Sequence, residues 1–185
     1  ELRYVAAVDS DGDHFANELL NLVRAAVYVQ EREGGEVMVL GSRTSKHRRS
    51  VADGDAVEPT IAELADGRLL MVMRGSNDAR HELPGHKWMA LSSDGGQTWG
   101  EVEPWKYADG EAFFSPSACS QLIPWTDGRL LWMGNICDEN PQGNRPRYPL
   151  VLGEVDRESG LLVRESVLFV DDRQAEDDEM LTLSN

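Results

Sequence analysis

A glutamate and an arginine stand on the two arms of one predicted hairpin, in the segment "EPTIAELADGRLLMVMR". Glu58 and Arg74 each lie eight residues from Asp66, the first residue of a D-G turn. A hairpin that turns at Asp66-Gly67 would therefore bring the two side chains level at one rim of a sheet. A carboxylate at such a rim can act as a general base, and the planar fork of an arginine can bind a ligand carboxylate through two hydrogen bonds. The alternative is an ion pair that merely closes the hairpin.

The elements that must position this pair are repeated along the chain. The sequence D-G-R-L-L occurs at 66–70 and again at 127–131, an offset of 61 residues. In each copy an apolar strand leads into the D-G turn and a second one leaves it, which is a strong hairpin signal, and two more short strands follow. Four strands per repeat, at a period of about sixty residues, are typical of a propeller blade. We therefore predict an all-β fold, a β-propeller of four-stranded antiparallel blades, with about two to three blades present.

The predicted boundaries follow from this repeat. We expect one domain over 1–185 that contains a partial blade at 24–43, blades at 58–106 and 116–170 packed face to face, and the start of a next blade at 179–185. Residues 1–20 predict a loop with one helical turn, and residues 44–56 an exposed connection. Two to three blades would leave blade faces bare to water, so the blade count predicts a fragment of a larger propeller that associates through its exposed blade faces.

The stretch "LSSDGGQTWG" at 91–100 joins two of the predicted strands by a turn that glycines and an aspartate favour. Its pattern S-x-D-x-G-x-T-W resembles the Asp box, or BNR repeat, of the sialidase (neuraminidase) family of β-propellers. In that family the box is a structural device on the outer hairpin of a blade, remote from the substrate. The resemblance therefore gives a structural role to five residues: Ser92, Asp94, Gly96, Thr98 and Trp99.

The same resemblance suggests roles for the residues at the rim. The segment around Glu58 and Arg74 is similar to the sialidase segment that carries the catalytic glutamate, a base toward a tyrosine nucleophile, and one of three arginines that bind the substrate carboxylate. "RYPLVLGEVDRESG" is similar to the segment of another of these arginines, which makes Arg147 the best match and Arg145 its competitor. No metal and no organic cofactor are implied.

Three parts of the family's machinery have no assigned residue. The remaining arginine and the acid aspartate are expected before Glu58, and "RTSKHRRS" supplies arginines only in a polar connection. The tyrosine is expected after Arg147, where Leu183 precedes Ser184 in the position that the family gives to tyrosine.

Two functions from different classes remain. The first is a sialidase-like glycoside hydrolase that releases a terminal acidic sugar, of the sialic-acid type, from glycans. The second is a non-catalytic BNR-repeat propeller that binds a glycan or a protein, which the Asp box supports equally well. The resemblance also favours a secreted or periplasmic location.

The composition argues against two classes of partner. The 18 Lys and Arg against 33 Asp and Glu give a net charge of −15, which argues against nucleic acid and a membrane surface as partners. No apolar run reaches the roughly 18 residues of a membrane span. Cys119 and Cys137 are too few for a disulfide framework, so two buried thiols are expected rather than one bridge.

Other chemistry-bearing residues give weaker signals. His81, His86 and the acidic run at 175–179 lack metal-ligand spacing. Ser115 and Ser117 could contact a glycan hydroxyl on a predicted inner strand. Four tryptophans recur at strand positions, where packing between blades is favoured over sugar stacking: Trp88, Trp105, Trp125 and Trp132.

Overall fold

The structure, a computed structural model, describes residues 58–178 and 180–183 in full, and the backbone alone of Val57 and of five short strands before it. In this part of the chain the fold is all-β, and the one helical element is a short 3₁₀ turn, η1 (Arg164–Ser166). The prediction of an all-β fold is confirmed.

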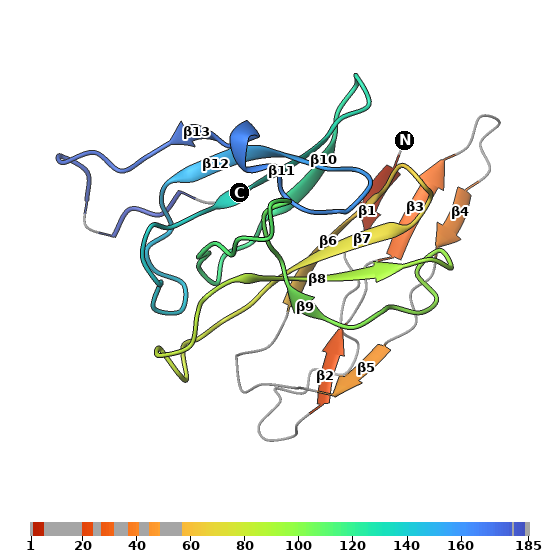
Figure 1. The fold of residues 1–185 in the computed structure, drawn as a ribbon, viewed down its shortest axis with the longest axis horizontal. Coiled ribbons are helices and arrows are strands. Elements are labelled where there is room, and N and C mark those ends of the chain that lie inside the picture. Colours follow the sequence, from red (N-terminus) through yellow and green to blue (C-terminus); the bar gives the residue numbers. More distant parts are fainter. Residues whose placement is uncertain are drawn as a thin grey trace.

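Two four-stranded antiparallel sheets account for most of the described residues, and each is a meander whose strands pair in chain order. The first contains β6 (Val57–Glu63), β7 (Leu69–Arg74), β8 (Lys87–Ser92) and β9 (Glu103–Pro104). The second contains β10 (Gln121–Pro124), β11 (Leu130–Asn135), β12 (Leu150–Val155) and β13 (Leu168–Asp171). The predicted meanders at 58–106 and 116–170 are therefore confirmed, and Figure 1 shows them as the yellow-green and the teal-blue parts of the fold.

The N-terminal strands form two smaller sheets. β1 (Leu2–Val5), β3 (Val27–Glu31) and β4 (Val37–Leu40) pair in the order β1-β3-β4, and β2 (Leu20–Val23) pairs with β5 (Ser45–Arg48). The β3–β4 hairpin falls within the predicted partial blade at 24–43. The expected loop at 1–20 and connection at 44–56 are wrong where β1 and β5 form.

The same local hydrogen bonds shape both D-G-R turns. In the first copy the Asp66 carboxylate accepts hydrogen bonds from the backbone N–H of Arg68 at 3.1 Å and from its Nε at 2.6 Å. The second copy has the same pair of bonds, from Arg129 to Asp127, at 3.1 and 2.8 Å. The glycine between them has a φ of +85° in one copy and +90° in the other, a region in which a Cβ would be strained.

The two large sheets share one hydrophobic core. Alternate residues of β6 and β7 face the second sheet, among them Leu70 and Val72, and both are fully buried. Trp105, just after β9, packs edge-to-face on Trp132 of β11 with ring centroids 5.2 Å apart. Burial of an aliphatic side chain such as Leu70 or Val72 contributes about 1.5–3 kcal/mol to the free energy of folding, so this cluster stabilises the packing of the two sheets. Two of the four tryptophans thus pack between sheets as predicted, whereas Trp125 lies on the turn after β10 and is exposed.

The opposite faces of the two sheets differ. In the first sheet, Met71 and Met73 are fully buried in a second apolar cluster, so both faces of this sheet are covered. In the second sheet, the outer strand β13 exposes Leu168, Phe169 and Val170, with 73% of Phe169 accessible. The first sheet is therefore an inner layer of the fold and the edge of the second is open.

The Asp box is a self-contained turn between β8 and β9. The Asp94 carboxylate accepts hydrogen bonds from Ser92 Oγ at 2.8 Å, Thr98 N–H at 2.9 Å and Thr98 Oγ1 at 2.6 Å. These bonds, those from Thr98 first, lower the pKa of Asp94 to about 2. Trp99 folds back into the second cluster and is buried. The geometry gives these residues a role in the turn.

Candidate functional site

The candidate residues lie at one edge that the two sheets share. β6 and β10 lie side by side and run in the same direction. Leu122 N–H donates to Thr60 Oγ1 at 2.9 Å, and Cys119 contacts Glu58, so the residue numbers rise together along the two segments. In antiparallel meanders the first strand begins, the second ends and the third begins at the same edge. The starts of β6, β8, β10 and β12 and the ends of β7 and β11 therefore share one rim (Figure 1).

Glu58 and Arg74 meet at this rim. β6 pairs with β7 so that Val57 lies opposite Arg74, and a bulge between Val57 and Thr60 turns Glu58 outward. Glu58 Oε2 lies 3.2 Å from Arg74 Nη1, so the predicted alignment of the two side chains is confirmed. Glu58 has a φ of +52°, a strained conformation for a residue with a Cβ, and such strain is concentrated at functional sites.

The Glu58–Arg74 ion pair is open to a ligand. The side chain of Glu58 is 44% exposed and that of Arg74 is 28% exposed. An ion pair this exposed contributes at most about 1 kcal/mol to stability. Stabilisation of the hairpin is therefore a weak explanation for the presence of this pair. Arg74 Nε is buried and has no hydrogen-bond partner among the described residues, so the protein does not use all of this guanidinium.

The thiol of Cys119 is the third group of the cluster, and its position was not predicted. Its Sγ donates a hydrogen bond of 2.9 Å to Glu58 Oε2, the same oxygen that faces Arg74. Burial, together with the Glu58 carboxylate, raises the pKa of Cys119, so the thiol keeps its proton at neutral pH. The structure therefore places a protonated thiol at the Glu58 carboxylate.

Leu183 lies at the same rim and has no hydrogen bond to Glu58 among the described residues. Its N–H donates to the Arg147 carbonyl at 2.8 Å, and its own carbonyl accepts a 2.8 Å bond from Asn135 Nδ2. Residues 180–183, the described part of the predicted next blade at 179–185, form no strand.

Lys87 is the most unusual side chain of the cluster. It is fully buried at the start of β8, directly opposite Arg74, and its Nζ donates to the carbonyls of Pro116, at 3.0 Å, and Ala118. Burial lowers the pKa of Lys87 to about 7; the nearby Cys119 and Glu58 raise it, whereas Arg74 and Arg147 lower it further. A group that changes its charge near neutral pH therefore lies beneath the rim.

The structure separates the two competing arginines. The positive charge of Arg147 lies near enough to Lys87 to lower the pKa of the lysine. The half-buried side chain of Arg147 donates a hydrogen bond from Nε to the Asn144 carbonyl at 3.3 Å. Arg145 is exposed, with Nη1 2.9 Å from Met180 Sδ. The preference for Arg147 over Arg145 as a carboxylate-binding residue stays a prediction.

Two asparagine side chains, the buried Asn77 and the partly buried Asn140, hold the loops that carry these residues. Asn77, in the β7–β8 loop, donates from Nδ2 to the carbonyls of Leu83 and Pro141, at 2.8 and 2.9 Å, and accepts from Gly143 N–H at 2.8 Å. Asn140, in the β11–β12 loop, accepts from Gly85 N–H at 2.8 Å in return. The loop that leads to Lys87 and the loop that leads to Arg147 are therefore bonded to each other.

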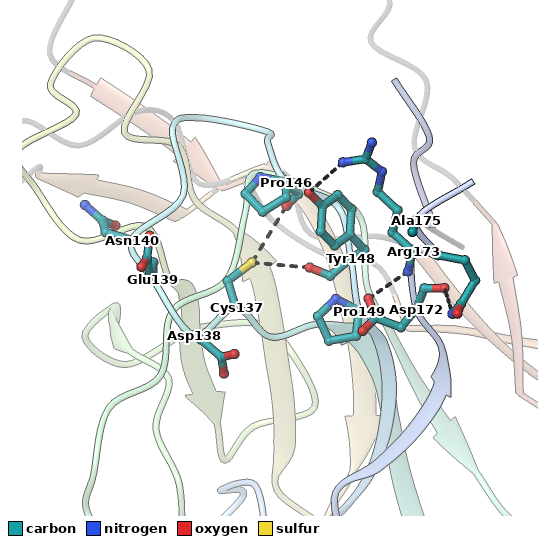
Figure 2. A pocket seen from close by; sticks show the side chains of 11 residues that line it. Cys137, Asp138, Glu139, Asn140, Pro146, Tyr148, Pro149, Asp172, Arg173 and Ala175 are labelled. Carbon is teal, nitrogen blue, oxygen red and sulfur yellow. Dashed lines mark hydrogen bonds between the residues drawn. The ribbon is translucent and has the colours of Figure 1, made fainter. Parts of the chain in front are cut away.

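An open pocket of about 560 Å³ lies farther along the rim, beside β12 and β13 (Figure 2). One wall is the segment 137–140 with residues 146, 148 and 149, and the other wall is the segment 172–175. Cys137 is buried between them, and its Sγ lies 3.7 and 3.8 Å from the carbonyls of Pro146 and Tyr148. Arg147 does not line this pocket, although both of its neighbours do.

Several other candidates lie elsewhere. The Asp box is at the opposite edge of the first sheet, since it joins the end of β8 to β9. Residues 113–120 are not an inner strand, because β10 begins only at Gln121, and that part of the prediction is wrong. Ser115 is buried and its Oγ donates to the Asn135 carbonyl at 2.7 Å, which leaves it inaccessible to a glycan.

The described residues contain neither a metal-binding cluster nor a helix that could span a membrane. No group of three or more His, Cys, Asp or Glu side chains in this part of the chain could hold a metal ion. Within the same residues, no helix has the length and apolar character needed to cross a membrane.

Comparison with known proteins adds little about function. No family model and no curated protein matches the chain. A solved structure of a protein of unknown function from Dyadobacter fermentans DSM 18053 is similar over 80% of this chain, with 15% identity and a TM-score of 0.41. The chain covers 45% of that protein's length.

The buried Lys87 generates a prediction about stability and pH. Its pKa of about 7 in the folded protein lies below the ordinary value of about 10.4, so between these pH values the unfolded chain binds the additional proton. The folded state therefore gains stability as the pH rises through this window and loses it as the pH falls toward 7. We expect the free energy of unfolding of the parent protein, relative to that of Lys87→Met, to rise with pH by up to about 1.4 kcal/mol per unit.

Urea unfolding at pH 7, 8 and 9 measures this difference. Lys106→Met is the matched control, because Lys106 is exposed on the segment after β9, and we expect its pH slope to follow the parent protein. Parallel slopes for the parent and Lys87→Met would mean that Lys87 stays charged throughout this range.

Proposed function

We propose that the chain is part of a sialidase-like β-propeller whose rim binds a terminal acidic sugar, of the sialic-acid type, and releases it from a glycan. The observation that carries this proposal is the Glu58–Arg74 pair, exposed at the rim and 3.2 Å apart, with Lys87 beneath it. Its cations suit a sugar carboxylate, and its carboxylate suits removal of a proton from a nucleophile that attacks the neighbouring carbon.

The arrangement of the sheets supports the propeller part of the proposal. Two four-stranded meanders pack through one core, and their first strands β6 and β10 run side by side in the same direction. Both faces of the first sheet are covered, as they would be in a blade with a neighbour on each side. In this arrangement β6 and β10 are the innermost strands, and Glu58 and Cys119 face the central axis.

Arg74 and Arg147 are the proposed groups that bind the sugar carboxylate. The side chain of Arg74 is 28% exposed, and its Nη1 faces the exposed Glu58 carboxylate, so a ligand can approach the Nη end of this guanidinium. Arg147 comes from the next sheet, so an acidic sugar held by both would bridge the two blades. Lys87 adds positive charge beneath them when protonated, which favours an anionic ligand below about pH 7.

Glu58 is the proposed general base. Its carboxylate already accepts a hydrogen bond from a side-chain S–H group, so it is oriented to take a proton from a neighbouring nucleophile. A positive φ and a bulge hold it out of the β6–β7 ladder, which keeps its oxygens at the rim.

A second candidate function is a non-catalytic propeller that binds an acidic glycan. The observation that favours it is the group bonded to Glu58, which is the protonated thiol of Cys119 and not a tyrosine hydroxyl. Leu183 stands in the position that the family resemblance gives to the tyrosine. The two candidates share the anion site and differ in whether bound sugar is turned over.

Glu58→Gln distinguishes the two functions. The amide keeps an acceptor for the Cys119 thiol but removes the charge and the basicity. For a hydrolase we expect turnover of a sialic-acid glycoside to fall about 10²–10⁴-fold, the usual contribution of a general base, while binding of free sialic acid is retained or strengthened. Glu63→Gln, at an exposed position of the same strand, is the matched control.

For the binding module there is no turnover to lose, and the same variant binds free sialic acid more tightly because Arg74 is released from its partner. A collapse of binding in Glu58→Gln would contradict both functions, since Glu58 would then only hold the hairpin together.

The arginines give a second test. Arg74→Lys and Arg147→Lys each replace a two-pronged fork by a point charge, and we expect each to weaken binding of sialic acid by about 1.5–3 kcal/mol, measured by titration calorimetry. Arg145→Lys is the control, because Arg145 is exposed and directed to Met180. Equal and mild losses at all three positions would show that the anion is bound elsewhere.

A further inference from the structure

The two thiols of the chain lie in different surroundings. The sequence contains two cysteines, Cys119 and Cys137, and neither forms a disulfide. Cys137 is buried, and its burial raises the pKa of the thiol to about 11. Cys119 is partly exposed and lies at the rim, in contact with Glu58. Of the two thiols, Cys119 is therefore the one that a sugar bound at the rim can meet.

A base lies in contact with this thiol. Cys119 Sγ donates to Glu58 Oε2 at 2.9 Å, within the reach that proton transfer from a nucleophile requires. A bulge and a positive φ hold Glu58 out of its ladder. Lys87 binds the carbonyls of Pro116 and Ala118, in the segment directly before Cys119. The thiol and the base are therefore positioned by separate parts of the fold, in addition to their mutual bond.

The charges around the pair allow the proton to move from the sulfur to the carboxylate. In the free protein, burial and the hydrogen bond to Glu58 raise the pKa of Cys119, so a base is needed to remove its proton. Transfer of this proton to Glu58 leaves the net charge of the pair unchanged, because the carboxylate is neutralised as the thiolate forms. Arg74, 3.2 Å from the same carboxylate oxygen, and Lys87 both favour the thiolate. The cations that balance the carboxylate can therefore balance the sulfur anion.

We propose that Cys119 is the catalytic nucleophile of this site, with Glu58 as its base. The proposal rests on the proposed hydrolase function and adds to it the residue that attacks the sugar. Because a thiolate is intrinsically a strong nucleophile, the reaction does not require a tyrosine hydroxyl at Glu58. The carbon attacked is the anomeric carbon, next to the sugar carboxylate that Arg74 and Arg147 are proposed to bind.

The reaction of an aryl glycoside balances in two steps. In the first, Glu58 takes the S–H proton, the sulfur of Cys119 bonds to the anomeric carbon, and the C–O bond to the aryl group breaks, so that phenolate leaves with the bonding electrons. In the second, a water oxygen attacks the same carbon, and the C–S bond breaks with its electrons on sulfur. Glu58 returns its proton to the sulfur, and the water releases one proton to the solvent. The products are the free acidic sugar, phenolate and a proton, and the protein is unchanged.

A sialyl fluoride with a second fluorine on the carbon beside the anomeric centre traps the sulfur–sugar bond. Fluoride leaves without a proton, and the second fluorine withdraws electrons and slows the departure of the sulfur. After incubation with the full chain, we expect intact-mass and peptide analysis to show a single added sugar on the peptide that contains Cys119. Cys137→Ser, the matched thiol control, should be labelled like the parent protein, and Cys119→Ser should not be labelled.

Turnover of an aryl sialoside separates a nucleophile from a structural thiol. The hydroxyl in Cys119→Ser can still donate to Glu58, so this variant preserves a structural role, but a serine hydroxyl is a far weaker nucleophile than a thiol. We expect Cys119→Ser and Cys119→Ala each to lose at least about 10³-fold in turnover. Cys137→Ser should turn over the substrate like the parent protein, and all three variants should bind free sialic acid as the parent protein does.

Three results would overturn the nucleophile while the hydrolase function stands: label on another residue, no label on a parent protein that turns over the aryl sialoside, or parent-like turnover in both Cys119 variants. Binding of sialic acid without any turnover by the parent protein would overturn the nucleophile and leave the non-catalytic module. If the parent protein neither binds nor turns over the sugar, the acidic-sugar site is overturned and the nucleophile with it.

Discussion

The buried amine of Lys87 is the constraint on which the rim depends. Its Nζ connects β8 of one sheet to the carbonyls of Pro116 and Ala118, which directly precede the first strand of the other sheet. Because an unpaired buried amine is costly, the loop 116–118 must pass where it can supply these acceptors. The next residue, Cys119, is thereby placed against Glu58. One buried polar group thus fixes the distance between the sheets at the point where the candidate residues meet.

Much of the fold could be predicted from the sequence because its determinants are local. Each D-G-R turn is closed by an aspartate that accepts two bonds from the arginine two residues later, so the repeat at 66–70 and 127–131 marks two equivalent hairpins. The same logic applies to the Asp box, where Asp94 bonds Ser92 and Thr98. The alignment of Glu58 with Arg74 followed from counting residues around such a turn. The strands β1 and β5 were missed because their pairing is not local.

The remaining site residues depend on contacts between sheets, although the sequence holds a signal for one of them. Cys119 follows Glu58 by 61 residues, the offset of the D-G-R-L-L repeat, so the two occupy equivalent positions of neighbouring sheets. Since β6 and β10 lie side by side, equivalent positions near their starts are close together, and the offset could have placed this thiol. Lys87 gave no comparable signal, because a lysine at the start of a strand is usually solvated, and only the loop 116–118 makes its burial possible. The pocket beside Tyr148 likewise depends on the fold, since its two walls come from segments more than twenty residues apart.

The rim above Lys87 is the proposed anion site, and Lys87 itself can report on it. The most direct measurement follows the side-chain nitrogen of Lys87 by NMR as the pH is raised, with and without sialic acid, using Lys87→Arg to assign the resonance. We expect a pKa near the value of about 7 that burial imposes in the free protein, and a higher pKa with the sugar bound, because a carboxylate nearby favours the charged amine. An ordinary pKa in the free protein, or one that sialic acid leaves unchanged at saturating concentration, would contradict the account.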